Sequence, residues 1–416
     1  MLENQSKMLN KDDFEFKWED GDQRGLAPAH ALEHDLSPYF STLRKFHSTS
    51  QMETSQQYAN IKREVDRIMS TIVGENLVFN QTKSDGPIRA TAWNIERGLQ
   101  IDGVINALKY HPRINNSDIL FLTELDFGMV RSGNRFVARE IAQSLRLNYA
   151  FTNCYISLVK GSGLESIVVG ENQYGLHGNA LFSKFPLTNV HALALPNGKD
   201  KMRGKEKRIG CQQAIVGLVG HPTQPFWAVT LHLDAHSTQN LRYRQMKLIL
   251  NHMDNLSPKL PVIIGGDWNT STFNSKRAIY SIIGYVFRVL MGIDNVLRNH
   301  YPHPDRWFER RLFRELEKRG YDYRSLNQLG TCTLHYDIND LSINSNMGDW
   351  IPNWCFWFIR KALKKVNGKC SMKLDWFAGR DLVPDLTNPP KVVGEIHDRS
   401  CSLSDHDPIV LDFHLR

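Results

Sequence analysis

The 416-residue sequence lacks the patterns that mark several large protein classes. Its six cysteines are widely spaced and form no C-x-x-C pair, so neither a zinc knuckle nor a dense disulfide framework is indicated. No run of about 18 apolar residues is present, and residues 1–22 are polar and acidic without the apolar core of a secretory signal. We therefore expect a cytoplasmic protein with no transmembrane segment.

Signatures of covalent catalysis are missing as well. The chain contains no G-x-S-x-G motif and no Cys/His nucleophile pattern, so no covalent nucleophile is predicted. Its composition is that of an ordinary globular enzyme, with 41% hydrophobic and 23% charged residues. The 51 Lys and Arg residues exceed the 44 Asp and Glu residues, and the resulting net charge of +7 favours an anionic partner.

Three regions can be distinguished along the chain. Residues 1–85 are rich in Gln, Ser, Asn and Lys, and the apolar spacing between Ser37 and Val73 predicts a helical prefix. Residues 86–416 are predicted to form one catalytic domain. This domain is interrupted at about 273–371, because the strand pattern stops there for far longer than a usual connection of about 4 to 6 residues. We expect a largely helical inserted subdomain.

Helical spacing recurs within the catalytic domain. It predicts helices at about 101–110 and 135–147, and a third helix that Ser237 caps and that runs to about 256. Inside the insertion, residues 278–290 and 304–319 are predicted helices.

The stretch from 262 to 271 is central to the prediction of function. Three β-branched residues at 262–264 predict a short buried strand, which the following Gly-Gly pair ends. Asp267 and Asn269 then leave the sheet, and their i, i+2 spacing places both side chains on one face of an extended chain. A carboxylate and an amide that converge in this way suit a metal ion or a phosphate, although alone they also suit an ordinary Asp-x-Asn turn.

Polar residues end several other predicted strands. These are Asn94 and Glu96, Glu124, His232, and Asp375, with Asp405 and His406 just before the last strand. A single acidic strand end is usually a solvated turn, but the repeated pattern indicates one polar pocket at one edge of the sheet core. Carboxylate and amide oxygens without thiolates favour a hard divalent cation, Mg²⁺ or Mn²⁺.

Seven segments together resemble the motifs of the endonuclease/exonuclease/phosphatase superfamily, which has the deoxyribonuclease I-like fold. In order they are Trp93-Asn94-Ile95-Glu96, Thr123-Glu124-Leu125-Asp126, Gly178-Asn179-Ala180-Leu181-Phe182-Ser183, Thr230-Leu231-His232-Leu233, Gly266-Asp267-Trp268-Asn269, Leu374-Asp375-Trp376-Phe377 and Ser404-Asp405-His406-Asp407-Pro408-Ile409. The resemblance covers about residues 86–272 and 372–416. It implies an α/β fold, a four-layer α-β-β-α sandwich of two mixed sheets, and metal-dependent hydrolysis of phosphoesters.

The same resemblance implies a metal site. Glu124 is similar to the principal Mg²⁺ ligand of the family, assisted by Asn94 and Asp405. Glu96 stands where the family commonly has a second acidic group near the metal.

It also implies catalytic roles for five further residues. Asp267 is similar to the residue that orients or deprotonates the attacking water. Asn269 and His232 are similar to donors to the phosphate oxygens, and His406 to a phosphate-side histidine that Asp375 holds. These roles agree with the chemistry, because in-line displacement at phosphorus concentrates negative charge that a cation and His or Asn donors stabilise.

The sequence leaves the substrate class open. A run of six Lys and Arg residues at 199–208 suits either a solvated loop or a surface for a nucleic-acid backbone, an inositol phosphate or an anionic lipid. We expect Asn179, Lys207 and Arg208 to contact an anionic phosphodiester, from nucleic acid or from a phospholipid or inositol phosphate headgroup. The aromatic tract Trp354–Phe358, beside four basic residues, suits either the core of the insertion or peripheral membrane contact.

Two other functions stay open. His232, Asp234 and His236 form an H-x-D-x-H pattern that suits a dinuclear zinc hydrolase. The sheet domain could also be a catalytically inactive scaffold module that binds anions.

Overall fold

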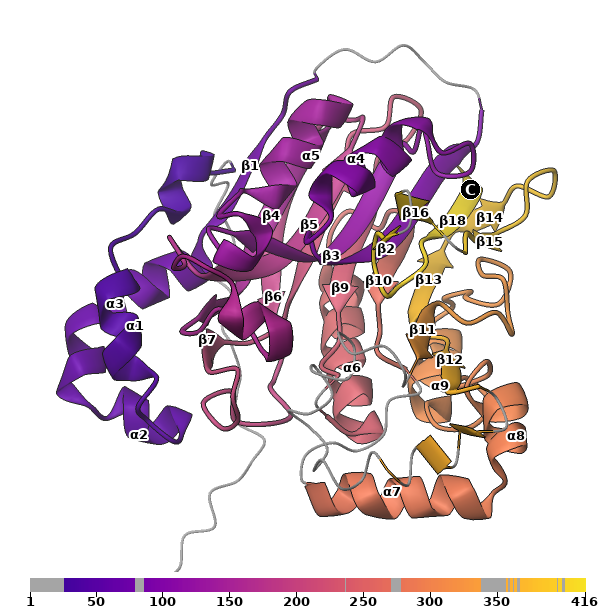
Figure 1. Cartoon of the computed structure of the whole chain (residues 1–416). Helices are drawn as coiled ribbons and strands as arrows, with labels where there is room; N and C mark the ends of the chain where they lie inside the picture. Colours follow the sequence, from indigo (N-terminus) through magenta and orange to yellow (C-terminus); the bar gives the residue numbers. More distant parts are fainter. Residues whose placement is uncertain are drawn as a thin grey trace, which may run out of the picture.

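A computed structural model of the chain shows a mixed α/β architecture (Figure 1). It describes residues 26–78, 86–235, 237–270, 278–337, 357, 360–361, 363–364, 367–394, 396–398 and 401–416.

The larger of the two main sheets is mixed. Its strands are, in spatial order, β1 (Ile72–Glu75), β4 (Asn148–Ser157), β5 (Leu176–Ser183), β3 (Ile119–Phe127), β2 (Ile88–Arg97), β18 (Ile409–Leu415) and β14 (Leu382–Pro384), with β7 (Arg208–Gly210) on β4 and β15 (Lys391–Val392) on β18. Strands β2 and β3 run parallel, and the other neighbours are antiparallel. The parallel pair brings the carboxyl ends of β2 and β3 to the same edge.

The smaller main sheet is also mixed. Its order is β13 (Asp375–Arg380), β10 (Val262–Asp267), β9 (Phe226–His232), β8 (Gln213–Val219) and β6 (Leu187–Ala194). Only β9 and β10 pair in parallel within it. Two antiparallel two-stranded sheets complete the described strands: β11 (Leu334–Asp337) with β12 (Lys369–Met372), and β16 (His397–Asp398) with β17 (Cys401–Ser402).

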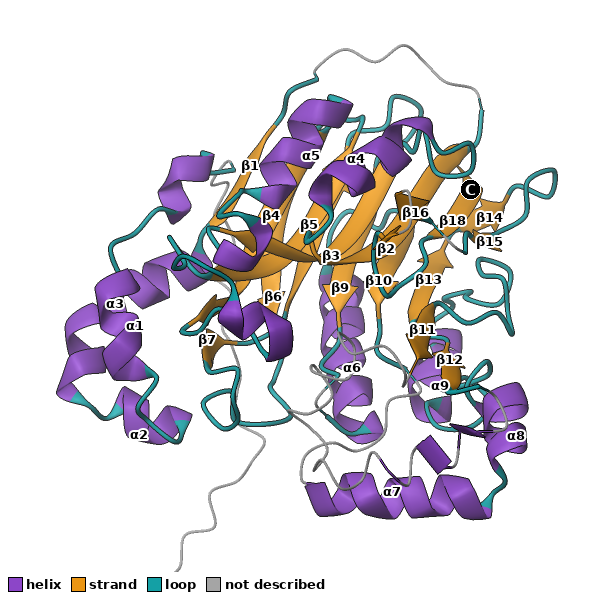
Figure 2. Cartoon of the chain, viewed as in Figure 1, coloured by secondary structure: helices purple, strands orange, loops and turns teal. Residues whose placement is uncertain are grey.

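Alternating side chains stack the sheets into a four-layer sandwich. In β3, Leu120 and Leu122 belong to the core under α4 (Ile101–Tyr110) and α5 (Val137–Leu145), whereas Ile119 and Phe121 belong to the core between the two sheets. The third core lies between the smaller sheet and α6 (Gln239–Asn255) with α9 (Arg310–Lys318). These cores give the order helices, sheet, sheet, helices, as predicted (Figure 2).

The prefix is helical between residues 37 and 70. Helices α1 (Ser37–Leu43), α2 (Thr49–Glu53) and α3 (Gln56–Ser70) lie together at the left in Figure 1. The range predicted as a helical prefix also contains β1, which pairs with β4 and so makes the prefix part of the larger sheet.

The insertion leaves and re-enters the smaller sheet at adjacent strands. It contains α7 (Ala278–Leu290), α8 (Ile293–Asn295) and α9. The predicted helix at 304–319 begins only at Arg310, because Glu309 before it is not helical. Of the aromatic tract, Trp354–Phe356 and Phe358 lie outside the described residues, and Trp357 is exposed. Among the described helices, none is long and apolar enough to span a bilayer.

Candidate active site

Three predicted catalytic residues form one row across the smaller sheet. Asp267 at the end of β10 is paired in register with His232 at the end of β9 on one side and with Asp375 at the start of β13 on the other. Neighbouring strands lie about 4.8 Å apart, so side chains in such a row that point to the same face touch one another. All three side chains are buried.

The carboxylate of Asp267 is the centre of this row. Its Oδ1 accepts a hydrogen bond of 2.8 Å from the backbone N–H of Asn269, and its Oδ2 accepts one of 3.1 Å from Nδ2 of Asn94. Nε2 of His232 lies 3.5 Å from the same Oδ2. Burial and the neighbouring Asp375 raise the pKa of Asp267 above its ordinary value, against the opposing effect of the nearby imidazoles.

His406 lies between two carboxylates, those of Asp375 and Asp267. Its Nδ1 lies 2.8 Å from Oδ2 of Asp375, and its Nε2 lies 3.8 Å from Oδ2 of Asp267. Trp93 of β2 donates its indole N–H to the backbone carbonyl of His406 at 2.7 Å, which ties this segment to the larger sheet. Burial alone would lower the pKa of His406, but Asp375 and Asp267 outweigh it and raise the pKa well above its ordinary value.

Glu96 and Glu124 of the larger sheet lie at irregular, bulged ends of β2 and β3. The β2–β3 pairing shifts register between Asn94 and Arg97, and the β3–β5 pairing shifts between Leu122 and Leu125. Glu96 and Glu124 stand there with positive φ angles of 46° and 58°. Such backbone costs roughly 1–3 kcal/mol for a non-glycine residue, and bulges re-aim side chains near active sites.

The two sheets meet through one amide group. Nδ2 of Asn94 donates to Oε1 of Glu124 at 3.2 Å and to Oδ2 of Asp267 at 3.1 Å. The predicted metal residue and the predicted water-activating residue therefore share a hydrogen-bond donor.

Three carboxylates on the side of Glu124 have the character of a cation site. Burial and Asp405 raise the pKa of Glu96 to about 8, and burial raises the pKa of Asp405, against the effect of His406 and with a further contribution from Glu124. Burial would raise the pKa of Glu124 too, but Arg97 and His232 lower it strongly. Mutual repulsion of this kind is relieved by a bound cation, and carboxylate oxygens with an amide oxygen are the ligands that Mg²⁺ prefers. The donor set fits a divalent ion.

A second possible metal site is formed by two carboxylates and an imidazole at the end of the smaller sheet. Ligand atoms of Asp267, Asp375 and His406 all lie within 4.8 Å of one another, a separation that also suits a metal. Within this group, Asp375 already forms a buried ion pair with His406.

Comparison with known proteins identifies the family. Residues 91–406 match the model of the Endonuclease/Exonuclease/phosphatase family. The chain belongs to this family. Its enzymes are phosphoric ester hydrolases, and they generally depend on a divalent metal.

Solved structures of the endonuclease/exonuclease/phosphatase family are similar to the chain, at low sequence identity. The family protein from Beutenbergia cavernae DSM 12333 is 12% identical, with a TM-score of 0.44 and coverage of 79% of this chain and 72% of that chain. The human Nocturnin catalytic domain with bound sulfate is 16% identical, with a TM-score of 0.43 and coverage of 83% and 97%. A D. rerio TDP2 humanized by 14 mutations is 14% identical, with a TM-score of 0.43 and coverage of 79% and 98%. No curated protein matches the sequence.

The remaining sequence-predicted residues of this family member lie at different places. Nδ2 of Asn269 donates to the carbonyl of Leu233 at 2.9 Å, next to the row of catalytic candidates. Asn179 is buried in β5, and its amide donates to the carbonyl of Gln213 at 3.0 Å. Lys207 contacts the prefix instead of the catalytic edge, with Nζ 2.6 Å from the carbonyl oxygens of Arg44 and Phe46.

Several charged residues near Glu124 were not predicted from the sequence. They are Arg97, Asp126, Arg131, Glu165 and His177, which form a buried network. Asp126 lies 2.8 Å from Nδ1 of His177, so the site has a second Asp–His pair besides Asp375 and His406. The i, i+2 spacing of Glu124 and Asp126 within one motif is the sequence signal for this pair, because it places both carboxylates on one face of the strand.

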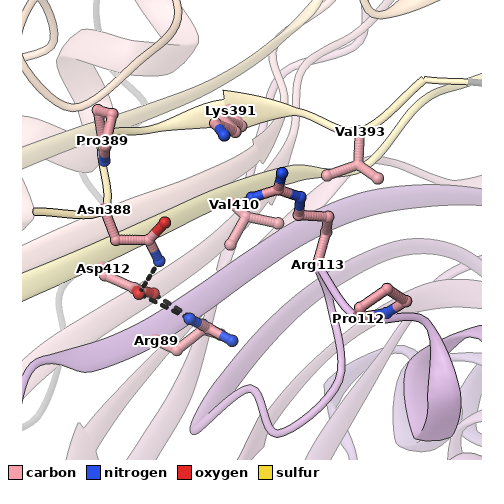
Figure 3. Close-up of a pocket in the computed structure, with 9 residues that line it drawn as sticks. All are labelled: Arg89, Pro112, Arg113, Asn388, Pro389, Lys391, Val393, Val410 and Asp412. Atoms are coloured by element: carbon pink, nitrogen blue, oxygen red, sulfur yellow. Dashed lines mark hydrogen bonds and ion pairs between the residues drawn. The ribbon is translucent and has the colours of Figure 1, made fainter.

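Basic residues line a cavity at the catalytic edge and another near the start of β2. One, of about 130 Å³, opens beside Glu124 and His232 and includes Arg208 in its lining. The other, of about 70 Å³, lies around Arg89 near the opposite end of β2 (Figure 3). There Asp412 is bound by Arg89 and Asn388, and Arg113 and Lys391 lie near Val410 (Figure 3).

Proposed function

We propose that the chain is a Mg²⁺-dependent phosphodiesterase in which a water attacks an anionic phosphodiester in line. The observation that carries this proposal is the amide of Asn94, which bonds both Glu124 and Asp267. It brings the metal candidates of the larger sheet and the catalytic candidates of the smaller sheet into one polar site.

Glu124 would be the principal ligand of the ion, with Asn94, Asp405 and Glu96 around it. Mg²⁺ or Mn²⁺ bound there would supply positive charge to the phosphate oxygens. The strained bulges at Glu96 and Glu124 support this assignment, because such backbone is typical of functional sites.

Asp267 would orient the attacking water and accept its proton. The backbone N–H of Asn269 fixes one carboxylate oxygen and leaves the other among Asn94, His232 and His406. A raised pKa brings a carboxylate closer to the working pH, which makes it a better general base.

His406, His232 and Asn269 would stabilise the phosphate oxygens. Asp375 fixes the ring of His406 through Nδ1 and leaves Nε2 toward the reacting group. A preorganised cationic donor of this kind acts on charge that develops in the transition state.

The substrate would be a nucleic acid, or a phospholipid or inositol phosphate headgroup reached by peripheral membrane contact. We also propose that the protein acts in the cytoplasm. The zinc alternative has less support, because the carboxylate of Asp234 is bound by Lys201 and by the N–H of Gly198. His236 of the same pattern lies outside the described residues.

Turnover of bis(p-nitrophenyl) phosphate tests the function and its alternatives. We expect hydrolysis with Mg²⁺ or Mn²⁺, none with EDTA, and loss of activity and of calorimetric Mg²⁺ binding in Glu124→Ala. Glu64→Ala, on α3 and away from the site, serves as control and should keep both. Activity with zinc alone would favour the dinuclear hydrolase, and no turnover with any metal would favour the scaffold. Unchanged metal dependence in Glu124→Ala would refute its assignment.

A further inference from the structure

The cavity beside Glu124 and His232, which we call the basic cavity, is continuous with the proposed active site. Both residues line it and also belong to the catalytic edge. Its volume of about 130 Å³ is well below the roughly 300–1,000 Å³ of pockets that enclose a whole drug-sized ligand. The basic cavity therefore suits one compact group of a substrate whose reacting part lies at the edge.

Positive charge dominates the lining of the basic cavity. The cationic side chains are Arg97, Arg131, Lys199, Lys201, Arg203, Lys205 and Arg208, and the carboxylates are Glu124, Asp200, Glu206 and Asp234. Two more carboxylates, Asp126 and Glu165, lie behind the wall against Arg131. Seven cations against six carboxylates leave an excess of positive charge even before Glu124 is assigned to the metal.

The deepest cations are fixed in position. Lys201 donates to both oxygens of Asp234 at 3.0 and 3.1 Å, and Arg131 forms two bonds with Asp126 at 2.7 and 2.9 Å. The side chains of Lys201 and Arg131 are only 6% and 5% exposed. Removing cations from water is costly, and an anionic ligand in the cavity would offset part of that cost.

Arg208 lines the cavity and is incompletely hydrogen-bonded. Its guanidinium lies 4.5 Å from the ring centroid of Tyr155 and 3.4 Å from the carboxylate of Glu206. Its Nε is buried and has no hydrogen-bond partner among the described residues. A guanidinium with a spare N–H is the side chain best suited to a phosphate group.

The prefix holds the loop that carries these cations. Asp200 accepts hydrogen bonds from the backbone N–H and the hydroxyl of Thr49, the latter at 2.6 Å. Lys207 donates to the carbonyl groups of Arg44 and Phe46. Because these contacts order the loop, less conformational entropy is lost when a ligand binds.

We infer that the basic cavity is a second anion subsite, which binds a phosphate group of the substrate other than the one that is hydrolysed. Preferred substrates would carry this second phosphate next to the scissile phosphoester, whether on a nucleotide or on a phosphorylated inositol headgroup. The inference rests on the proposed function, because it uses the same catalytic edge.

Matched substrate pairs test the inference. One pair is a p-nitrophenyl ester of a nucleotide with and without a second phosphate on its sugar, and the other is glycerophosphoinositol with and without added phosphates. A charge-assisted hydrogen bond to the second phosphate should raise kcat/KM by at least about 10-fold within one pair. The pair that shows the larger ratio identifies the source of the phosphate.

Variants locate the effect. Two variants remove cations from the basic cavity: Arg208→Gln, and the double variant Arg203→Gln, Lys205→Gln. In each, the ratio of kcat/KM with and without the second phosphate should fall by about 10-fold or to near one. The double variant is included in case Arg208→Gln does not fold, because the side chain of Arg203 is 69% exposed and its replacement should not disturb the fold. Arg113→Gln with Lys391→Gln removes two charges from the other cavity (Figure 3) and should keep the wild-type ratio.

Binding without turnover completes the test. Calorimetry in EDTA should show that a nucleoside bisphosphate or a phosphorylated glycerophosphoinositol binds the control variant more tightly than the Arg208→Gln protein. Wild-type ratios near one in both pairs, together with equal binding by the two variants, would overturn the inference and make the basic cavity a structural ion network. Magnesium-dependent hydrolysis of the esters without a second phosphate would still uphold the proposed function. If no ester is hydrolysed, the proposed function fails and the calorimetric comparison alone decides the subsite.

Discussion

The ion pair between Arg242 and Glu309 gives a quantitative prediction about the insertion. Arg242 lies on α6, Glu309 immediately precedes α9, and both side chains are completely buried. Nε of Arg242 donates to Oε1 of Glu309 at 2.9 Å, whereas Oε2 of Glu309 has no hydrogen-bond partner among the described residues. Burial raises the pKa of Glu309 although Arg242 opposes this, so the carboxylate depends on its partner to stay charged.

Replacement of one partner should be far more harmful than replacement of both. Glu309→Leu or Arg242→Met leaves an uncompensated buried group and should lower the free energy of unfolding by about 3–5 kcal/mol. The double variant Arg242→Met, Glu309→Leu should lie within about 1–2 kcal/mol of wild type, because a well-packed apolar pair replaces a buried ion pair at little cost. The coupling free energy would then be at least about 4 kcal/mol.

Urea unfolding of wild type, both single variants and the double variant measures this cycle. Tryptophan fluorescence and circular dichroism should give coincident transitions, so that midpoints and slopes convert to free energies. If the loss in the double variant equals the sum of the two single losses, the residues are independent and the account of how α9 is joined to α6 is wrong.

Three further predictions concern the site, the loop and pH. Asp267→Asn and His406→Ala should each lower kcat by at least about 10²-fold on bis(p-nitrophenyl) phosphate with KM nearly unchanged, and an effect on KM alone would mean that they only bind substrate. Lys207→Met should lower the free energy of unfolding by about 0.5–1.5 kcal/mol, because it removes two partly exposed hydrogen bonds to carbonyl groups of the prefix, whereas a raised KM with unchanged stability would favour the role predicted from the sequence. Burial and the neighbouring His191 lower the pKa of His252 from 6.5 to about 4, so the unfolded chain binds a proton that the folded chain does not. The stability of the wild type should therefore be full above pH 6.5 and fall as pH drops toward 4, and His252→Gln should flatten this part of the unfolding profile.

Local patterns predicted most of the secondary structure. The helix expected at 101–110 is α4, with the same bounds, because its apolar side chains follow one helical face and bury it. The cap of α6 was placed one residue early: Thr238 accepts from the N–H of Leu241, while the hydroxyl of Ser237 donates to the carbonyl of Asp234. Both residues are good caps, and only the backbone geometry distinguishes them.

Tertiary contacts determined what local patterns could not predict. Ile72–Glu75 follows a helix without a long alternating pattern, and it becomes a strand because the edge of β4 is available. The basic run at 199–208 signals charge, but whether a lysine faces the active site or the prefix depends on partners more than a hundred residues away, as with Lys207 and Arg44. Motif order could group the candidate residues on one edge, whereas their mutual contacts required the register of β9, β10 and β13.

The inserted segment begins and ends at two neighbouring strands, and this explains how the fold can accommodate so many additional residues. The chain leaves β10 and returns to β13 beside it, and the stem is closed by a bond from the N–H of Trp268 to the carbonyl of Leu374 and by one from the hydroxyl of Thr270 to the carbonyl of Lys373. The entropy of closing a loop between fixed ends grows with the logarithm of its length, by about 0.6 kcal/mol for each doubling. A segment of about a hundred residues in place of a ten-residue hairpin thus costs the catalytic strands only about 2 kcal/mol. Loop-closure entropy therefore sets only a weak limit on segment length at this point, and the stronger constraint is the packing of α9 against α6.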